Sequence, residues 1–207
     1  MRRALAALLV LAAVPAVGQK QPDMPKDPPG QPLLSLAAAG TYKVDSDHTQ
    51  VLFTVNHLGF SEYSGQFTSP AGTLVLDLQD ATKSKVDVSF PIVGVQTTVP
   101  ELDTHLKSAD FFDAAKYPTA HFVSTQIEMR NTSAMIVGNL TLKGVTHPVI
   151  LKADFIGAGP APMAPHKTNI GFTATGHFDR SQFNMSYGVP LVSDRVELVI
   201  HAAFEHQ

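Results

Sequence analysis

The stretch YKVDSDHTQVLFTVNHLGFSEYSGQF, residues Tyr42–Phe67, predicts the fold of this chain. Apolar side chains occupy alternate positions from Val51 to Val55, and the polar residues Thr54 and Asn56 fall on the opposite parity. A period of two is typical of a β-strand with one apolar face. Because the stretch contains no nucleophile motif, metal cage or phosphate loop, we interpret it as one wall of an apolar container.

The same alternation recurs along the rest of the chain and predicts about eight strands in all. The further segments are 74–78, 86–92, 121–125, 136–142, 149–155, 170–179 and 196–205. Evenly spaced strands with polar residues on one parity are typical of an antiparallel barrel or sandwich. The alternation is interrupted at Leu102 and Leu106, whose spacing of four residues is helical. This spacing predicts one or two short helices near residues 101–115. The Pro-rich run Gly157 to Pro165 predicts a long loop.

The interior of such a barrel is the candidate functional site. An eight-stranded barrel either fills its interior with side chains or holds one small ligand, and both readings stay open at this point. Gly138, Ala153 and Ala174 on the inward parity leave room for a guest or relieve packing. His57 on the first strand contacts a ligand's polar head or bonds to a neighbouring strand. The candidate ligand-binding residues are Phe53, Val55, His57, Phe60, Phe111, Phe112, Phe122, Phe172 and Phe183.

The N-terminal region predicts export and a tether. Arg2 and Arg3, an apolar run and a small-residue site ending at Gly18 have the form of a secretory signal over residues 1–18. The apolar run is shorter than the roughly 20 residues that span a membrane. Residues 19–40 are Pro-rich and polar at their start, which predicts a disordered linker, and residues 41–207 form one domain. We therefore expect a periplasmic or extracellular protein.

Catalytic chemistry is weakly represented in the sequence. The chain has no Cys and no Gly-x-Ser-x-Gly, His-Glu-x-x-His, Walker or Gly-x-Gly-x-x-Gly motif, so we assign no catalytic residue, no metal ligand and no cofactor. The balance of 15 Lys+Arg against 18 Asp+Glu argues against binding to nucleic acid, which needs a basic face. One alternative is a hydrolase that uses Asp45, Asp47 and His48, or His105 with Asp110, as an acid–base pair.

Several segments in their order give the chain a specific resemblance. It resembles the YceI-like family, the polyisoprenoid-binding, lipocalin-like periplasmic proteins, from Tyr42 to the C-terminus. The matching residues are Asp47-His48, Val51-x-Phe53-x-Val55-x-His57-Leu58-Gly59-Phe60, Gly65-x-Phe67, His105-Leu106-Lys107-Ser108-Ala109-Asp110-Phe111-Phe112-Asp113, Lys116-Tyr117-Pro118-x-Ala120-x-Phe122, Gly138-Asn-Leu140-Thr141-Leu142-Lys143-Gly144-Val145-Thr146, Arg180-Ser181-x-Phe183 and Val192-Ser193-Asp194-x-Val196.

The resemblance implies an all-β, extended eight-stranded antiparallel lipocalin-like barrel with an apolar tunnel. It implies an exported, non-enzymatic protein that holds a long isoprenoid or fatty-chain molecule as a carrier, store or sequestering agent. A non-catalytic partner of a membrane redox or transport complex is the alternative. A membrane surface as a further partner and a homodimer stay open. One departure occurs: after Arg180-Ser181 the family has Asp-Phe-Gly, whereas this chain has Gln182-Phe183-Asn184, which replaces the glycine of that turn.

Overall fold

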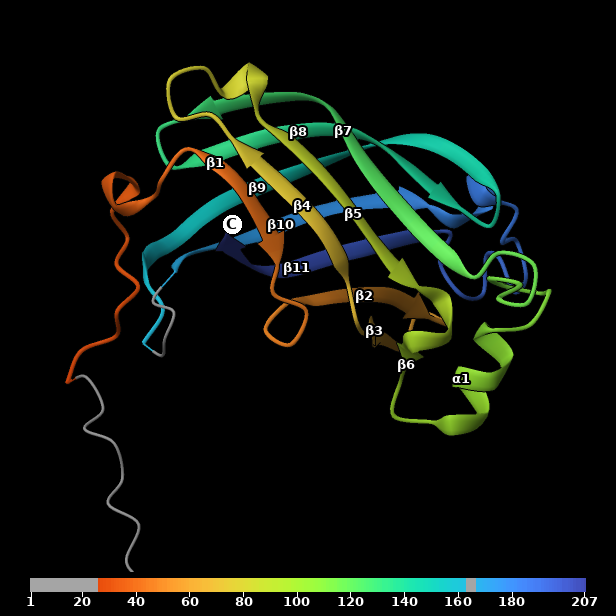
Figure 1. Cartoon of the computed structure of the whole chain (residues 1–207). Helices are drawn as coiled ribbons and strands as arrows, with labels where there is room; N and C mark the ends of the chain where they lie inside the picture. Colours follow the sequence, from red (N-terminus) through yellow and green to blue (C-terminus); the bar gives the residue numbers. More distant parts are fainter. Residues whose placement is uncertain (1–25, 163–166) are drawn as a thin grey trace, which may run out of the picture.

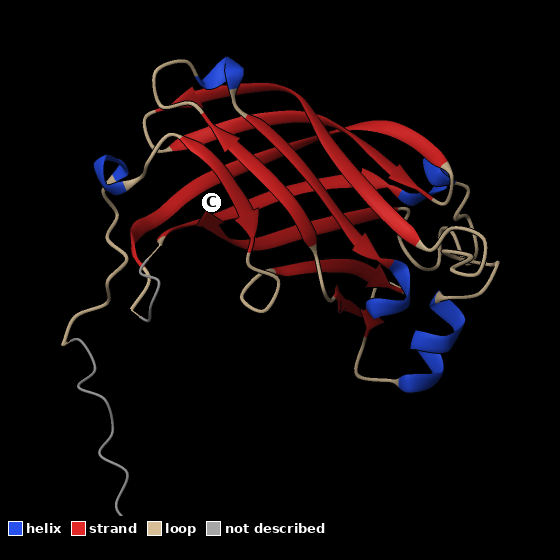
Figure 2. Cartoon of the chain, viewed as in Figure 1, coloured by secondary structure: helices blue, strands red, loops and turns tan. Residues whose placement is uncertain are grey.

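The structure, a computed structural model, describes residues 26–162 and 167–207, and most of them lie in antiparallel β-strands (Figures 1 and 2). The strands are β1 (Gly40–Val44), β2 (Gln50–His57), β3 (Ser61–Phe67), β4 (Ala71–Leu76), β5 (Lys85–Pro91), β6 (Val95–Gln96), β7 (Thr119–Arg130), β8 (Ser133–Leu142), β9 (Val145–Pro160), β10 (Thr168–Asp179) and β11 (Arg195–His206). The α-helix is α1 (Pro100–Leu106), and short 3-10 turns are η1 (Leu34–Leu36), η2 (Ala81–Lys83), η3 (Ile92–Gly94) and η4 (Arg180–Phe183).

Eight of these strands close into a barrel. The neighbours in the sheet follow the order β1-β4-β5-β7-β8-β9-β10-β11, and β11 pairs back with β1. Closure removes the free sheet edges that would otherwise invite pairing with other chains. The predicted eight-stranded antiparallel barrel is therefore confirmed.

Strand β11 pairs with a different strand at each of its two ends. The C-terminal part of β11 pairs with β1, where Tyr42 lies opposite His206, whereas its N-terminal part pairs with β2, where Thr54 lies opposite Glu197. From β2 the sheet continues through β3 to the two-residue β6. The helix α1 follows β6 and lies beside this end of the barrel (Figure 1). One end of the barrel thus receives extra strands, a helix and several loops.

Two β-bulges bend the long strands. The register shifts between Ser124 and Gln126 of β7 and between Gly171 and Phe172 of β10. An extra residue locally increases strand twist and bending, and designed barrels use such bulges to close. On β9 the extra residue is Ile156, which is 57% exposed.

Buried apolar residues form two clusters along the barrel. The cluster near α1 includes Phe67, Ile92, Phe112, Leu140 and Phe183, among others. The second cluster lies toward η1 and includes Tyr42, Leu74, Leu76, Ile170 and Phe204. Together these clusters form the apolar interior of the barrel.

Several expectations change in detail. The stretch Tyr42–Phe67 carries β1 and β3 in addition to the predicted strand, which is β2, and turns at 45–49 and 58–60 divide the three. The predicted loop at Gly157 begins later, since β9 runs to Pro160. Residues 107–117 form consecutive turns rather than a second helix.

The small residues of β9 have a structural reason. Ala158 exchanges two backbone hydrogen bonds of 3.0 Å with Gln31. A Cβ at Gly157 would lie 3.1 Å from the Gln31 carbonyl oxygen. The segment around Gln31 can therefore approach β9 closely only because the side chains of β9 are small at this point. In the expected linker, Gln31 thus pairs with β9 and Ala37 is buried, whereas Leu33 and Leu36 are exposed and residues 19–25 lie outside the described residues. The expected signal at 1–18 lies outside the described residues, and none of the described helices is long and apolar enough to cross a membrane.

Candidate functional site

The barrel encloses an apolar cavity of about 490 Å³. This volume lies in the range of small-molecule binding pockets. Its wall follows β11 from Val196 to Phe204, a length of roughly 26 Å at about 3.3 Å per residue. The cavity is therefore an elongated tunnel that suits a chain-like guest rather than a compact one.

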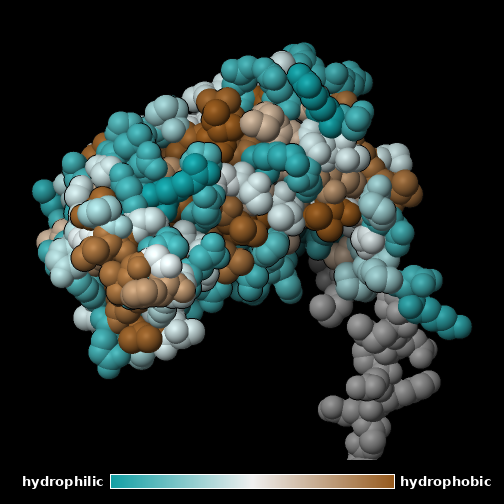
Figure 3. Space-filling view, turned by 180° about the vertical axis from the view of Figure 1, so that it is seen from behind, coloured by the Kyte–Doolittle hydropathy of each residue, from teal (hydrophilic) through white to brown (hydrophobic). Residues whose placement is uncertain are grey.

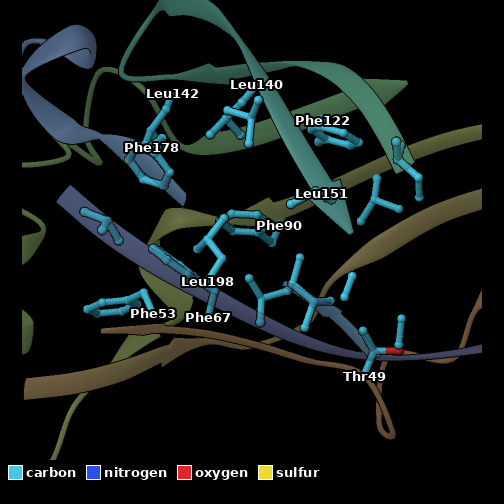
Figure 4. A pocket seen from close by; sticks show the side chains of 18 of the residues that line it. Thr49, Phe53, Phe67, Phe90, Phe122, Leu140, Leu142, Leu151, Phe178 and Leu198 are labelled. Atoms are coloured by element: carbon cyan, nitrogen blue, oxygen red, sulfur yellow. The ribbon is translucent and has the colours of Figure 1, made fainter. Parts of the chain in front are cut away.

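The tunnel is a real space and not a tightly packed core. Phe53, Phe90, Phe178, Leu198 and Ile200 line it, yet each remains partly exposed although it belongs to the inward parity of its strand. In a filled interior these side chains would be covered by their neighbours, because protein cores pack at crystal-like density. Figure 4 shows several of them projecting from different strands into the same space.

Two glycines accommodate aromatic rings on the tunnel wall. A Cβ at Gly65 would lie 2.8 Å from Phe53 Cε1, and a Cβ at Gly138 would lie 2.6 Å from Phe122 Cε2. The room at Gly138 is therefore occupied by a ring of the protein itself, not by a guest. The rings of Phe53 and Phe122 form part of the tunnel wall beside these glycines.

Polar lining residues gather at the two ends of the tunnel. At the end away from α1, the Thr49 hydroxyl bonds the Ala203 backbone and the Ser84 hydroxyl accepts from the Asp77 N–H, so both are satisfied by the wall. Figure 4 shows Thr49 at the opposite end of the cavity from Phe53. Between the ends the lining is aliphatic and aromatic. The tunnel thus offers a long apolar section with polar termini.

We call the α1 end the mouth; its polar lining residues are His57, Tyr63, Thr97, His105, Arg180 and Tyr187. The Nε2 atom of His105 lies 3.0 Å from Asp110 Oδ2, and the Tyr63 hydroxyl lies 3.2 Å from the Thr98 hydroxyl. Within the described part of the chain, the Tyr187 hydroxyl and the His57 ring have no hydrogen-bond partner. These two groups are free to bond a ligand's polar head.

Arg180 fixes the loop that borders the mouth. Its guanidinium donates to the carbonyls of Met185, Tyr187, Val192 and Ser193 at 2.7–2.9 Å, and the residue is 4% exposed. Burial lowers the pKa of Arg180, and attraction to the Asp194 carboxylate opposes that shift. The Asp194 carboxylate itself bonds Ser181, so Arg180 orders the loop as a cation held by carbonyl oxygens.

The turn after Arg180 contains an asparagine in a left-handed conformation. Asn184 adopts φ 59°, a left-handed conformation, at the end of η4. Asn tolerates this region better than other residues with a Cβ. Asn184 thus adopts the left-handed conformation that glycine favours, at the position where the family pattern has glycine.

Seven of the nine candidate ligand-binding residues line the tunnel: Phe53, Val55, His57, Phe111, Phe112, Phe122 and Phe172. Phe60 and Phe183 do not line it. Phe60 lies at the tip of the β2–β3 turn and is 89% exposed. Phe183 is fully buried between Phe178 and His147, at ring-centroid distances of 5.2 and 5.3 Å. A turn and a 3-10 helix do not follow strand parity, which explains why these two side chains do not point into the tunnel.

Other lining residues were missed. Leu198 and Ile200 had the correct parity but were left out in favour of aromatic residues. His105 joins Leu102 and Leu106 on one face of α1, so the helical spacing could have indicated it. Tyr187 lies in an irregular loop, and no sequence period marks it.

The acidic cluster at residues 45–48 does not belong to the tunnel. His48 Nδ1 lies 2.8 Å from Asp45 Oδ2 in the turn between β1 and β2, with the His48 side chain 75% exposed. The cluster borders a separate shallow depression, whereas the neighbouring Val44 and Thr49 line the tunnel. The geometry is that of a turn stabilised by its own side chains.

Comparison with known proteins agrees with this architecture. The family model described as "YceI-like domain" matches residues 42–204. Protein YceI of Escherichia coli is 39% identical over 166 residues, which cover 79% of this chain and 86% of that protein.

Solved structures show the same fold. The YceI protein of Campylobacter jejuni has a TM-score of 0.65 and 30% identity, covering 73% of this chain and 90% of that one. A polyisoprenoid binding domain from Saccharophagus degradans has a TM-score of 0.61 at 10% identity, covering 80% of this chain and 98% of that one. At that identity the second likeness concerns the fold alone.

Proposed function

The chain belongs to the YceI-like family, and on that premise we propose that it holds a long isoprenoid or fatty-chain molecule in its tunnel. The single observation that carries the proposal is the elongated apolar cavity of about 490 Å³ with inward side chains left partly uncovered. The fold-level likeness to a domain that binds polyisoprenoids supports the same ligand class.

The chemistry of the wall favours a chain with no polar groups along its length. Each CH₂ moved from water into the tunnel contributes about 0.8 kcal/mol. Ordering a flexible chain offsets part of that gain. Selectivity among ligands then depends on the length of the chain and on its polar head group, because the middle of the tunnel has no polar side chain that could hydrogen-bond the ligand.

The head of the ligand belongs at the mouth in this proposal. The His57 ring and the Tyr187 hydroxyl are available there as hydrogen-bonding groups, and the buried Arg180 cation favours an electron-rich head. A carbonyl, hydroxyl or phosphate head fits this environment. The Arg-Arg and apolar start of the chain supports export, so we place the function in the periplasm.

Binding is tested by uptake of a fluorescent long-chain lipid into delipidated protein, with competition by unlabelled compounds. Unlabelled prenols and fatty acids long enough to fill the tunnel should displace the probe. Short-chain analogues with the same heads serve as the control and should not. Absence of uptake, or equal competition by the short analogues, contradicts a chain-binding tunnel.

A further inference from the structure

Exposed apolar side chains surround the mouth of the tunnel. They lie on two neighbouring loops, the β2–β3 turn and the loop between η4 and β11. We call them the mouth patch, with exposed fractions of 43% for Leu58, 89% for Phe60, 54% for Tyr187, 36% for Val189 and 65% for Leu191. Figure 3 shows brown and tan residues gathered at the lower left, the end that carries α1 in Figure 1. A contiguous apolar patch on a protein surface marks an interaction site.

The two loops of the mouth patch are joined into one unit. The Leu58 N–H donates to the Leu191 carbonyl at 2.7 Å, and the Ser193 N–H donates to the Asn56 carbonyl at 2.9 Å. His57 forms a bridge with Val192. From the other side, Arg180 holds the carbonyls of the same loop. Hydrogen bonds therefore fix the backbone of both loops that carry the mouth patch.

Leu58 occupies a position that its side chain disfavours. It has φ 59° and is followed by Gly59 at φ 71°, and the Phe60 N–H closes the turn onto the His57 carbonyl at 3.1 Å. Two left-handed residues define a type I′ hairpin turn, which favours Asn or Gly at its first central position. A leucine there loses backbone energy, and its side chain still remains 43% exposed. Such an outlier points to a function for the apolar side chain.

The tunnel opens within the mouth patch. Tyr187 belongs to both, and the tunnel-lining residues His57, Gly188 and Val192 are chain neighbours of patch residues. A guest that enters by this route passes between the patch side chains. A lipid bilayer in contact with the patch would present its acyl chains directly at the opening.

Size and charge favour a bilayer over a second copy of the chain. The five side chains expose roughly 570 Å², taking about 200 Å² for each large side chain. A stable protein interface needs about 800 Å² on each partner. The segment from Met185 to Val192 carries no charged residue, and neither does Leu58 to Phe60. Turn tips with exposed Phe, Leu and Tyr suit the interface region of a membrane.

We propose that the mouth patch docks on a lipid bilayer, so that the ligand moves between membrane and tunnel without crossing water. This inference rests on the proposed lipid-binding function. Because the patch is uncharged, docking should occur on zwitterionic vesicles and should change little with salt, in contrast to docking by basic residues.

The test is flotation of the purified protein with phosphatidylcholine vesicles. Wild type should co-float, and Phe60→Glu and Leu191→Glu should each weaken partitioning by roughly tenfold or more, since a charge is placed where an apolar group entered. Ile150→Glu is the matched control on the barrel side, where the native residue is 53% exposed, and it should behave as wild type. Leu58→Asn should weaken flotation while keeping or raising Tm, because Asn suits the turn.

Uptake of a fluorescent lipid from dilute ethanol separates the two proposals. Patch variants should load from ethanol as wild type does and load slowly from vesicles. If the wild-type protein takes up the lipid from ethanol but does not co-float with vesicles, the docking proposal is overturned and the tunnel function is not. If the wild-type protein takes up the lipid from neither source, the tunnel function is overturned. Docking is also overturned if both glutamate variants float as wild type does, or if sedimentation shows a dimer that these substitutions dissociate.

Discussion

The ring of Phe53 on β2 lies against Gly65 on β3, its partner in the ladder, where any added Cβ would come within 2.8 Å of Phe53 Cε1. The Gln96 carbonyl oxygen confines the same position at 2.9 Å. A glycine at residue 65 therefore sets where an aromatic ring lies on the tunnel wall. A ring also lies against Gly138 on β8, where an added Cβ would come within 2.6 Å of Cε2 of Phe122 on the neighbouring β7, although the ladder partner of Gly138 is Ser124.

Gly65→Ala should destabilise the barrel and reduce ligand capacity. The added methyl must displace the Phe53 ring toward the tunnel or push β6 away, and overpacking of this kind costs about 1–3 kcal/mol. Urea unfolding and probe uptake measure the two effects. Gly171→Ala is the control, since its nearest atom would lie at 3.8 Å, and it should show neither. Equal stability of the Gly65 and Gly171 variants contradicts the steric account.

Arg180→Met should loosen the mouth loop. Four carbonyl oxygens, those of Met185, Tyr187, Val192 and Ser193, lose their donor in a buried setting. We expect a loss of at least about 3 kcal/mol in the free energy of unfolding. Arg180→Lys should lose an intermediate amount, because an ammonium keeps the charge but offers three donors. Arg195→Met, at an exposed site, should have little effect, and an equal loss there would contradict the assigned role.

Leu198→Trp should block the tunnel without unfolding the barrel. Leu198 lines the cavity, so a larger side chain enters empty space instead of a packed core. Probe uptake should fall while Tm stays near that of wild type. The chain has no native Trp, so the emission of the new residue reports its apolar surroundings. Val199→Trp, on the outward parity of the same strand, should keep normal uptake; if it also loses uptake, the block is not a tunnel effect.

Tyr42 makes stability sensitive to alkaline pH. The residue is fully buried, and its hydroxyl donates to the Ala38 carbonyl at 2.8 Å and accepts from the Ala38 N–H at 3.0 Å. Burial raises the pKa of Tyr42, partly offset by the Ala38 bond. A pKa that is higher in the folded state gives a contribution fully present below the unfolded pKa of about 10 and lost as pH rises through the folded pKa.

Tyr42→Phe separates these contributions. At neutral pH the variant should be less stable by about 1 kcal/mol, because it loses the hydrogen bonds to Ala38. Above pH 10 the difference should shrink, since Phe cannot ionise. Urea unfolding at pH 7, 9 and 10.5 measures it. A gap between variant and wild type that stays constant across this series contradicts the assignment.

Strand alternation predicted most of the strands but did not separate a barrel from a sandwich, and the barrel came from the resemblance to the YceI-like family. Residues 51–57, 86–91 and 196–205 lie in strands, since burial of one face imposes a period of two on the sequence. The same rule named Phe53, Val55, His57, Phe122 and Phe172, all of which line the tunnel. It did not separate a packed interior from an empty one, because both place apolar residues inward.

The side chains whose positions the sequence could not predict lie in turns and loops, where residues do not alternate between two faces. Phe60 follows a turn whose backbone directs it to solvent, and Phe183 lies on a 3-10 turn packed against Phe178. Tyr187 reaches the mouth only because Arg180 holds its loop through carbonyl oxygens, which no side-chain pattern reveals. Contacts of this kind depend on tertiary structure.

The measurement that tests the central claim most directly is native mass spectrometry of the protein purified under mild conditions from its own cells. The account predicts one long-chain amphiphile per chain in the wild type and none in Leu198→Trp. Release of the ligand by organic solvent should leave a folded protein that accepts a long-chain lipid again. A wild-type protein that carries no such molecule in repeated preparations, and binds none when it is offered, would contradict the account.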